Sequence, residues 1–179
     1  MIVKTIFSGF GGQGVLMMGY SFAHGAMSEG YEVTYLPAYG AEVRGGTANC
    51  TVAVGDEEIA SPIASEPDYL VVLNTPSLYT FQNRIAAGGL LFLNSSIISA
   101  RPSRQDMEVF AIPASDIAEE LGNARAFNTV MMGAFLKRTS LVKPEIYLKS
   151  LETVMGSKKK AVVEINRKAF SAGYDFLKA

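Results

Sequence analysis

The sequence contains a single cysteine, Cys50, and no tryptophan. One cysteine excludes an intramolecular disulfide framework, and it also excludes an iron–sulfur cluster held by this chain alone, because such a cluster needs several thiolates. An excess of charge of one sign is also lacking, since 16 Lys and Arg side chains face 17 Asp and Glu side chains, for a net charge of −1. A nucleic-acid-binding domain usually carries a basic excess, so the composition argues against nucleic acid as a partner.

Long hydrophobic runs are absent from the sequence as well. No apolar stretch approaches the roughly 20 residues that a membrane span needs. The apolar run at residues 1–8 has neither the basic region nor the small-residue cleavage site of a signal peptide, so it indicates a strand. We therefore expect a cytoplasmic protein with a reduced thiol and no membrane contact. At 179 residues, of which 49% are hydrophobic, the chain suits one domain spanning residues 1–179.

Short β-type runs alternate with helical patterns along the chain. Strands are expected at residues 2–8, 31–36, 47–54, 68–73, 90–93 and 108–112, and helices at 15–28, 76–85, 115–121, 125–137, 144–155 and 160–177. Gly55 and Asp56 favour a hairpin turn into residues 57–60, and Ser115 is expected to cap the helix that follows it. The alternation predicts an α/β fold: a three-layer domain with a mainly parallel, mixed sheet covered by helices, and a Rossmann-like first strand–turn–helix unit.

The segment GFGGQG, residues 9–14, has the G-x-G-x-x-G spacing directly after a strand and directly before a helix. Glycine permits a sharp turn there, and the helix N-terminus presents unpaired N–H groups to an anion. A dinucleotide site of this kind also needs a carboxylate about 20 residues on, at the end of the second strand. That strand instead ends at Leu36 and Pro37, and Glu32 comes too early. A dinucleotide site, another anion site and a purely structural turn are therefore all open, whereas the absent G-K-[ST] excludes a P-loop.

A second glycine-rich loop, YGAEVRGG at residues 39–46, follows the second strand. Loops that follow parallel strands meet at the carboxyl edge of a sheet, so both glycine-rich loops are expected to face the same crevice. Arg44 offers a planar guanidinium fork, Glu42 can pair with it, and Tyr39 adds an aromatic surface. Small polar residues also follow the strands that end near residues 73, 93 and 112, which favours a shared binding edge over isolated helix caps.

Three other features are better explained by packing in the core than by a catalytic role. His24, the sole histidine, lies in the first predicted helix beside apolar neighbours. Cys50 lies in a strand pattern and is expected to be a small buried hydrophobe. The methionines are expected to fill irregular gaps in the core, and the adjacent pair near residue 131 is equally compatible with a subunit contact; the set is Met17, Met18, Met27, Met131 and Met132.

Five segments together resemble one family: GFGGQGV (residues 9–15), PAYGAEVRGGTANC (37–50), SP (61–62), PD (67–68) and AFNTVMMGAF (126–135). This family is the gamma-type subunit of thiamine-diphosphate-dependent 2-oxoacid:ferredoxin or flavodoxin oxidoreductases. The resemblance covers most of the chain to about residue 136, and the two glycine-rich loops at this distance from one another are its most specific feature. The continuation TANC (47–50) looks more like the 2-oxoglutarate enzymes than the pyruvate enzymes.

The resemblance implies a part in the oxidative decarboxylation of a 2-oxoacid with coenzyme A to an acyl-CoA and CO2, with ferredoxin or flavodoxin as electron acceptor. It implies alpha-, beta- and ferredoxin-like delta-type partner subunits, and a complex that uses thiamine diphosphate, magnesium, an iron–sulfur cluster and coenzyme A. The sequence has no G-D-G with paired asparagines for a diphosphate cofactor and only one cysteine. We therefore expect that this chain alone binds none of these cofactors and has no catalytic residue or metal site.

Two sets of residues are the candidate site. Gly9, Gly11, Gly12, Gln13 and Gly14 are expected to contact a coenzyme A phosphate or a partner subunit, and Tyr39, Glu42, Arg44, Gly45 and Gly46 are expected to complete a docking edge. Two alternatives remain at this stage. One is a stand-alone nucleotide- or dinucleotide-binding protein that uses residues 9–14, and the other is an indolepyruvate oxidoreductase component with the same domain.

Overall fold

Six strands form the central sheet of the computed structural model, which describes residues 1–40, 46–156 and 160–177. The strands are β1 (Ile2–Phe10), β2 (Glu32–Tyr39), β3 (Thr47–Gly55), β4 (Tyr69–Val72), β5 (Leu90–Asn94) and β6 (Glu108–Ile112). The helices are α1 (Val15–Ser28), α2 (Thr75–Phe81), α3 (Ala114–Glu120), the short 3-10 helix η1 (Ala124–Ala126), α4 (Phe127–Thr139), α5 (Pro144–Met155) and α6 (Lys160–Phe176). The strand order across the sheet is β2-β3-β1-β4-β5-β6.

The sheet is mixed, with one strand that runs against the others. β1, β4, β5 and β6 are parallel neighbours, whereas β3 is antiparallel to both β1 and β2. β2 consequently runs in the same direction as β1, although β3 separates the two. The carboxyl ends of five of the six strands therefore lie at one edge of the sheet. This arrangement confirms the predicted α/β fold with a mainly parallel, mixed sheet.

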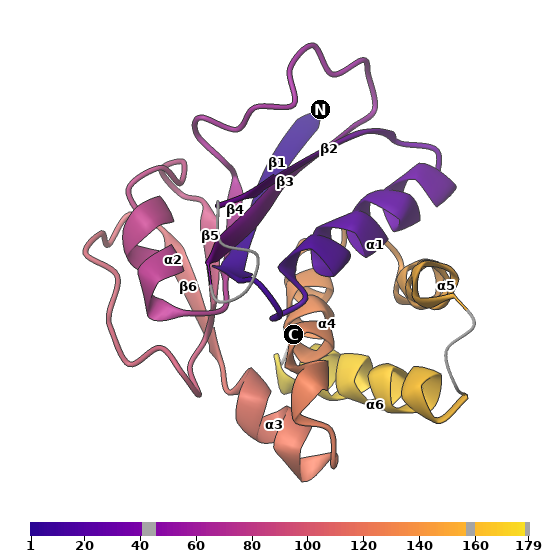
Figure 1. Cartoon of the computed structure of the whole chain (residues 1–179). Coiled ribbons are helices and arrows are strands. Elements are labelled where there is room, and N and C mark those ends of the chain that lie inside the picture. The colour runs from indigo at the N-terminus through magenta and orange to yellow at the C-terminus, as the bar shows by residue number, and fades with distance from the viewer. Residues whose placement is uncertain (41–45, 157–159, 178–179) are drawn as a thin grey trace.

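Helices cover both faces of the sheet (Figure 1). α2 lies on one face, and α1, α4, α5 and α6 lie on the other. The two resulting cores are separate: one packs Leu78 and Phe81 of α2 against β4 and β5, and the larger one packs α1 and α4 against β1, β3 and β5. Of the helices in the described residues, none is both long enough and apolar enough to cross a membrane.

Phe135 of α4 is the centre of the larger core. Its ring makes edge-to-face contacts with Phe7 of β1, Phe22 of α1 and Phe92 of β5, with ring centroids 5.6, 5.4 and 5.3 Å apart. All four side chains are fully buried. Aromatic pairs in this geometry contribute beyond the area they bury, so this cluster joins α4 to β1, α1 and β5, which come much earlier in the sequence.

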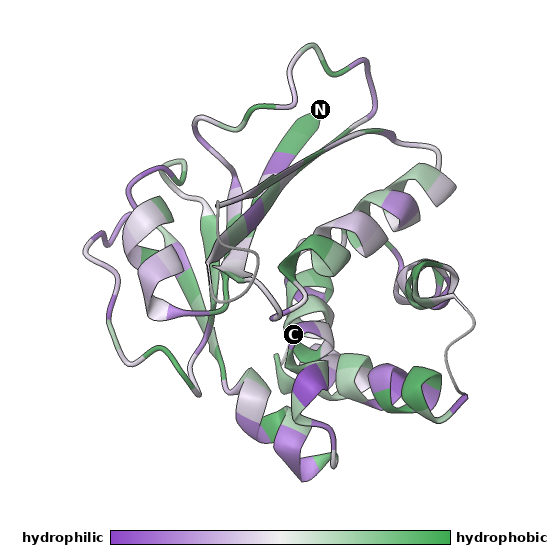
Figure 2. Cartoon of the chain, viewed as in Figure 1, coloured by the Kyte–Doolittle hydropathy of each residue, from purple (hydrophilic) through white to green (hydrophobic). Residues whose placement is uncertain are grey.

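α4 and α6 cross at two glycines. A Cβ atom on Gly133 of α4 would overlap the carbonyl oxygen of Phe170, and a Cβ atom on Gly173 of α6 would overlap the carbonyl oxygen of Val130. The two backbones approach closely because neither helix has a side chain at the crossing. α6 alternates hydrophobic and hydrophilic segments along its length (Figure 2), as expected for a helix with one packed face.

The structure corrects three predictions. Residues 57–60 do not form the predicted second strand of a hairpin. The antiparallel strand of the sheet is β3, which pairs with β1 and β2. α3 begins at Ala114 with Pro113 as its N-cap, and the Ser115 hydroxyl accepts a hydrogen bond from Asn94 instead of capping the helix. Pro37 lies inside β2 and does not end it, because β2 is an edge strand, where a missing N–H is tolerated.

We expect Gly173→Ala to destabilise the protein by about 1–3 kcal/mol, because the added methyl group forces α4 and α6 apart. The same substitution in an unconstrained helix would be stabilising. Thermal or denaturant unfolding measures the effect. Ser171→Ala, at an exposed position of the same helix, is the control and should change the free energy of unfolding by no more than about 0.5 kcal/mol. Equal effects of the two variants would contradict the tight crossing.

Candidate functional site

The Gly-rich turn, defined here as residues 9–14, connects β1 to α1 at the carboxyl edge of the sheet. Gln13 holds it together, because its Oε1 accepts hydrogen bonds from the Phe10 N–H at 2.7 Å and from Asn74 Nδ2 at 3.0 Å. A Cβ atom on Gly9 would lie 2.7 Å from this Oε1 and 2.8 Å from a methyl group of Val15. Gly9 and Gln13 therefore set the shape of the turn.

Gly14 is the N-cap of α1 and has a left-handed backbone, with φ +77°. This conformation is strained for any residue with a side chain. A Cβ atom here would also overlap the side-chain Nδ2 of Asn128, which lies in the first turn of α4. The amide of Asn128 thus packs directly over the start of α1.

Backbone N–H groups of the Gly-rich turn divide into two groups. The N–H of Gly11 donates to the carbonyl of Gly46 at 2.9 Å, and the N–H of Gln13 donates to the carbonyl of Phe10 at 3.1 Å. The N–H groups of Gly12 and Gly14 have no acceptor among the described residues. Because they lie at the N-terminus of a 14-residue helix, the helix dipole favours an anion beside them.

The described ends of the second glycine-rich loop, Tyr39, Gly40 and Gly46, lie beside the Gly-rich turn. Tyr39 ends β2, Gly40 donates its N–H to the carbonyl of Thr47 at 3.0 Å, and Gly46 accepts the hydrogen bond from Gly11. Strand β3 brings them together, since it pairs with β2 on one side and β1 on the other. Three further predicted site residues lie outside the described residues: Glu42, Arg44 and Gly45.

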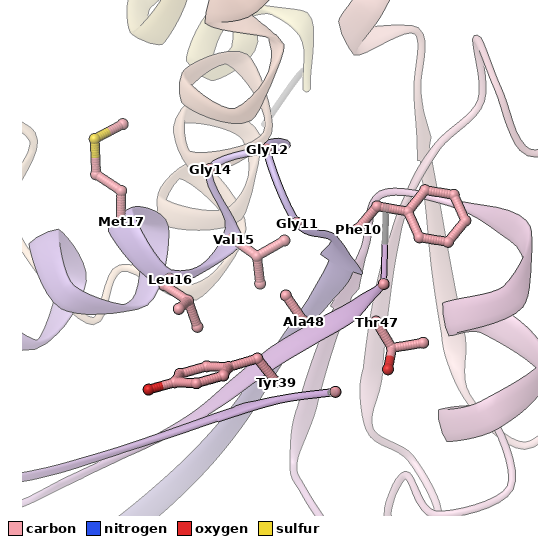
Figure 3. A pocket seen from close by; sticks show the side chains of 12 residues that line it. Phe10, Gly11, Gly12, Gly14, Val15, Leu16, Met17, Tyr39, Thr47 and Ala48 are labelled. Carbon is pink, nitrogen blue, oxygen red and sulfur yellow. The ribbon is translucent and has the colours of Figure 1, made fainter. Parts of the chain in front are cut away.

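An apolar groove of about 580 Å³ lies between the two loops. The Gly-rich turn and the first residues of α1 form one wall, and Tyr39, Gly40 and residues 46–48 form the other. Leu16 and Tyr39 face one another across it, whereas Phe10 and Met17 point away toward its ends (Figure 3). Tyr39 is 72% exposed, more than any other aromatic side chain in the described part of the protein. Such a surface is typical of a contact site.

A second groove of about 680 Å³ lies on the other side of the Gly-rich turn; we call it the polar groove because asparagine and arginine side chains are among its lining residues. Gly12, Gln13 and Gly14 form one wall. The opposite wall comes from η1, α4, the end of α5 and α6, with these lining residues: Asn123–Asn128, Met155, Val162 and Asn166. Gly12, Gly14 and Met17 line both grooves, so the turn is the ridge between them.

Asn128 provides a side-chain amide to the wall of the polar groove. It is only 4% exposed, and its Nδ2 has no acceptor within the described part of the chain. The exposed guanidinium of Arg125 lines the same groove and adds a positive charge. Backbone N–H groups, an amide donor and a guanidinium together suit an anion such as a phosphate group.

Hydrogen bonds between side chains also join the ends of neighbouring strands. Asn74 accepts from the Ser77 N–H and so caps α2, and the Ser8 and Ser77 hydroxyls lie 2.9 Å apart. Asn94 donates to Ser115 at 2.9 Å. These polar residues at the carboxyl edge therefore stabilise the loops, with Asn74 reaching the Gly-rich turn through Gln13.

The residues interpreted as structural are packed as expected, with one exception. His24 Nδ1 lies 3.0 Å from the Ser150 hydroxyl, between α1 and α5. Cys50 is fully buried, and burial raises the pKa of its thiol to about 12, so it is no nucleophile near neutral pH. Met131 and Met132 are both fully buried, but Met27 is 62% exposed. Met27 is nine residues after Met18, about 180° around the helix, and so faces solvent.

Metal ligands do not gather anywhere in the described residues: no three His, Cys, Asp or Glu side chains there are placed to hold an ion. With a single thiol, the chain also lacks the donor set of an iron–sulfur cluster.

The family model described as pyruvate ferredoxin/flavodoxin oxidoreductase matches residues 4–176. The chain belongs to this family. Ketoisovalerate oxidoreductase subunit VorA from Methanothermobacter thermautotrophicus is 39% identical over 176 residues, which are 97% of this chain and 36% of VorA. 2-Oxoglutarate synthase subunit KorC from Methanocaldococcus jannaschii is 32% identical, over 96% of this chain and 91% of KorC. The chain thus spans about a third of one family member and most of another.

Solved structures of the family have the same architecture. The gamma subunit of a keto/oxoacid ferredoxin oxidoreductase from Geobacter sulfurreducens superimposes with a TM-score of 0.85 at 25% identity, over 98% of this chain and 95% of that subunit. The predicted family is thereby confirmed. The narrower 2-oxoglutarate assignment is not, because relatives named for ketoisovalerate and for 2-oxoglutarate both match.

Sequence reasoning missed Asn128 and Arg125 as site residues. Asn128 belongs to the segment at residues 126–135 that carries the family resemblance, but its distance of over 100 residues from the Gly-rich turn hides the contact. A signal was available: an asparagine and a threonine start a helix whose other early residues are apolar. Polar residues at such a buried position call for partners.

We predict that Gly14→Ala costs more stability than Gly88→Ala. The two glycines have nearly the same φ, +77° and +76°, but no atom lies within 4 Å of a Cβ atom on Gly88. Gly88→Ala should cost about 1–2 kcal/mol from backbone strain alone. Gly14→Ala adds the clash with Asn128, so its free energy of unfolding should fall further, and Asn128→Ala in the same chain should recover part of the difference. Denaturant unfolding of the three variants measures both effects, and an equal loss at Gly14 and Gly88 would contradict the close approach of Asn128.

Proposed function

We propose that this chain is the gamma-type domain of a multisubunit 2-oxoacid:ferredoxin or flavodoxin oxidoreductase, and that residues 1–179 act in it as one domain. Family membership supports this role, and the two grooves beside the Gly-rich turn are the observation that carries it. The proposed reaction is oxidative decarboxylation of a 2-oxoacid with coenzyme A to an acyl-CoA and CO2. Ferredoxin or flavodoxin is the proposed acceptor.

The redox and decarboxylation cofactors do not fit this chain. Its single cysteine is buried, and no G-D-G with paired asparagines is present in the sequence. On our proposal, thiamine diphosphate with magnesium and the iron–sulfur cluster belong to alpha-, beta- and delta-type partners. The chain therefore contributes no catalytic residue, and its own chemistry is binding and positioning.

The polar groove is the proposed position of a coenzyme A phosphate. Gly12 and Gly14, whose N–H groups have no acceptor among the described residues, line it, Asn128 adds an amide donor, and Arg125 supplies a charge. A phosphate ester presents several anionic oxygens, which match this number of converging donors. The apolar groove shares the two glycines but has no amide or guanidinium side chain among its described lining residues, so we assign the phosphate to the polar side of the turn.

The apolar groove and Tyr39 are the proposed docking edge for the subunit that holds thiamine diphosphate. Leu16 and Tyr39 form its opposite walls, and exposed aromatic side chains are frequent anchors of protein interfaces. Glu42, Arg44 and Gly45 complete this edge on our proposal. Docking beside the polar groove brings coenzyme A near the partner's cofactor.

The oxoacid is proposed only as a class. Ketoisovalerate and 2-oxoglutarate are the two substrates to test first, because relatives named for each match the chain. The groups that select the oxoacid belong, on this proposal, to the subunit that holds thiamine diphosphate. Indolepyruvate is the third substrate for such an assay.

Stand-alone dinucleotide binding is disfavoured by the strand order. In a dinucleotide fold the second strand lies beside the first and carries the ribose carboxylate at its end. Here β3 lies between β1 and β2, and it runs in the opposite direction. β2 also ends in Tyr39, which has no carboxylate.

We expect Asn128→Asp to raise the KM for coenzyme A at least tenfold in the complex purified with its partner subunits, with kcat at saturating coenzyme A nearly unchanged. The variant removes a donor and places an anion beside the phosphate, and a hydrogen bond to a charged group contributes about 1.5–3 kcal/mol. Arg125→Ala should raise KM as well. Asn83→Asp, at an exposed position that lines neither groove, is the control. Unchanged KM in both test variants would refute the phosphate assignment.

Tyr39→Asp should weaken assembly with the partner subunits by at least about tenfold, because it places a charge on the apolar docking edge. The wild-type chain is expected to copurify with subunits that carry thiamine diphosphate and iron–sulfur clusters. Tyr79→Asp is the matched control, since Tyr79 is 59% exposed but lies on α2, on the other face of the sheet. Affinity purification and analytical ultracentrifugation measure the yield of complex. Arg44→Ala tests the contribution of residues 42–45 to the docking edge in the same assay. Normal assembly of both Tyr39→Asp and Arg44→Ala would refute the docking proposal.

A further inference from the structure

β2 is an edge strand with an exposed, largely apolar end. It is the first strand in the order β2-β3-β1-β4-β5-β6, so it has a neighbouring strand on one side only. Residues 36–39, LPAY, are all exposed, with Leu36 at 40% and Tyr39 at 72%. An open apolar edge is a template for pairing with a strand of another molecule. With eight residues, β2 is long enough for such a pairing.

The hydrogen bonds to β3 determine which backbone groups of β2 face the open edge. Gly40, directly after β2, donates its N–H to the carbonyl of Thr47 at 3.0 Å, in the register that pairs the residues of β2 with those of β3. Residues that exchange hydrogen bonds alternate with residues that do not, so the even-numbered residues of β2 bond to β3. The N–H and C=O groups of the odd-numbered residues therefore face the open edge, and these residues are Val33, Tyr35, Pro37 and Tyr39.

The pairing of β3 with β1 leads to the same assignment. The N–H of Gly11 donates to the carbonyl of Gly46 at 2.9 Å, in the register of the β1–β3 pair, so the even-numbered residues of β3 bond to β1. The odd-numbered residues of β3 are then left for β2, which agrees with the bond between Gly40 and Thr47. The outward N–H groups of β2 have no acceptor among residues 1–40, 46–156 and 160–177.

Pro37 occupies one of these outward positions, where it presents a carbonyl group but no N–H. Its ring carbon Cδ takes the place of the hydrogen and faces the side from which another strand would approach. In the two-fold antiparallel arrangement that sets residues 35–39 against the same residues of a second copy, residue 37 lies opposite itself. Both hydrogen bonds at the centre of that arrangement are then missing. A proline at position 36 or 38 would instead remove a hydrogen bond to β3.

The strand at the opposite edge of the sheet contains no proline, but it is shorter. β6 has five residues, and the N–H of Glu108 donates to the carbonyl of Gly89 at 3.0 Å. The even-numbered residues of β6 therefore bond to β5, and within β6 only Val109 and Ala111 direct their backbone groups outward. A very short edge strand is itself a protection against pairing. Of the two edges, the longer one is thus the one that has a proline at an outward position.

We infer that Pro37 prevents β2 from pairing with the β2 strand of a second copy of this chain. The residue leaves the bonds between β2 and β3 intact and removes a donor only on the open side. The inference concerns the chain by itself and does not rest on the proposed function.

The experiment measures self-association of the full chain by sedimentation equilibrium over a range of concentrations. Pro37→Val restores one outward N–H in each copy, so a symmetric pair gains two hydrogen bonds, and the association constant should rise at least about tenfold over the wild type. Pro37→Thr restores the same N–H with a polar side chain and should act in the same direction. Ala38→Val is the matched control, because it adds a valine at the neighbouring exposed position, whose N–H already bonds to β3. It should associate no more than the wild type.

Hydrogen–deuterium exchange identifies the surface that pairs. In Pro37→Val, the N–H groups of Tyr35 and Tyr39 should exchange more slowly as the protein concentration rises, whereas their exchange in Ala38→Val should follow the wild type. The inference is wrong if neither Pro37→Val nor Pro37→Thr associates more strongly than the wild type. It is also wrong if Ala38→Val has the same effect, or if the stronger association leaves the N–H groups of β2 unprotected.

Discussion

The close approach of Asn128 to Gly14 is the constraint on which the arrangement of the site depends. Gly14 starts α1 with a left-handed backbone and has no side chain, so the first turn of α4 can pack its amide against the start of α1. On its other side the Gly-rich turn is tied to β3 by the hydrogen bond from Gly11 to Gly46. The turn is thus a narrow ridge of backbone with a groove on each side. A side chain at Gly14 would overlap the Asn128 amide and prevent this close approach.

The two grooves differ in chemistry because different elements form their outer walls. The apolar groove is bounded by the ends of β2 and β3, which bring an exposed Tyr39 near Leu16. The polar groove is bounded by η1, α4 and α6, which bring Arg125 and Asn128 near the free N–H groups of the turn. A single turn can therefore serve two ligands of different polarity, and the proposed function assigns a partner subunit to one groove and a phosphate to the other.

Periodicity in the sequence predicts the regular elements well. The expected helices at 15–28 and 144–155 and the expected strand at 108–112 match α1, α5 and β6. The predictions fail where the usual preference of a residue is overridden by the pairing of strands in the sheet. Gly55 and Asp56 favour a hairpin turn, but β3 is already paired on both sides, so no position beside it is free for residues 57–60. A proline normally ends a strand because it has no N–H to donate. Pro37 is tolerated within β2 because β2 lies at the edge of the sheet and has a neighbouring strand on one side only.

The sequence by itself determined the family, the class of fold and the meeting of two glycine-rich loops, because these depend on local spacing and on the direction of parallel strands. The tertiary structure alone decided the rest of the site. Only the packing of α4 against the sheet and α1 brings Asn128 and Arg125 to residues 9–14, from more than 100 positions away. No local pattern encodes that distance, since it results from the buried Phe135 cluster. The strand order that separates β2 from β1 is likewise a property of the whole sheet.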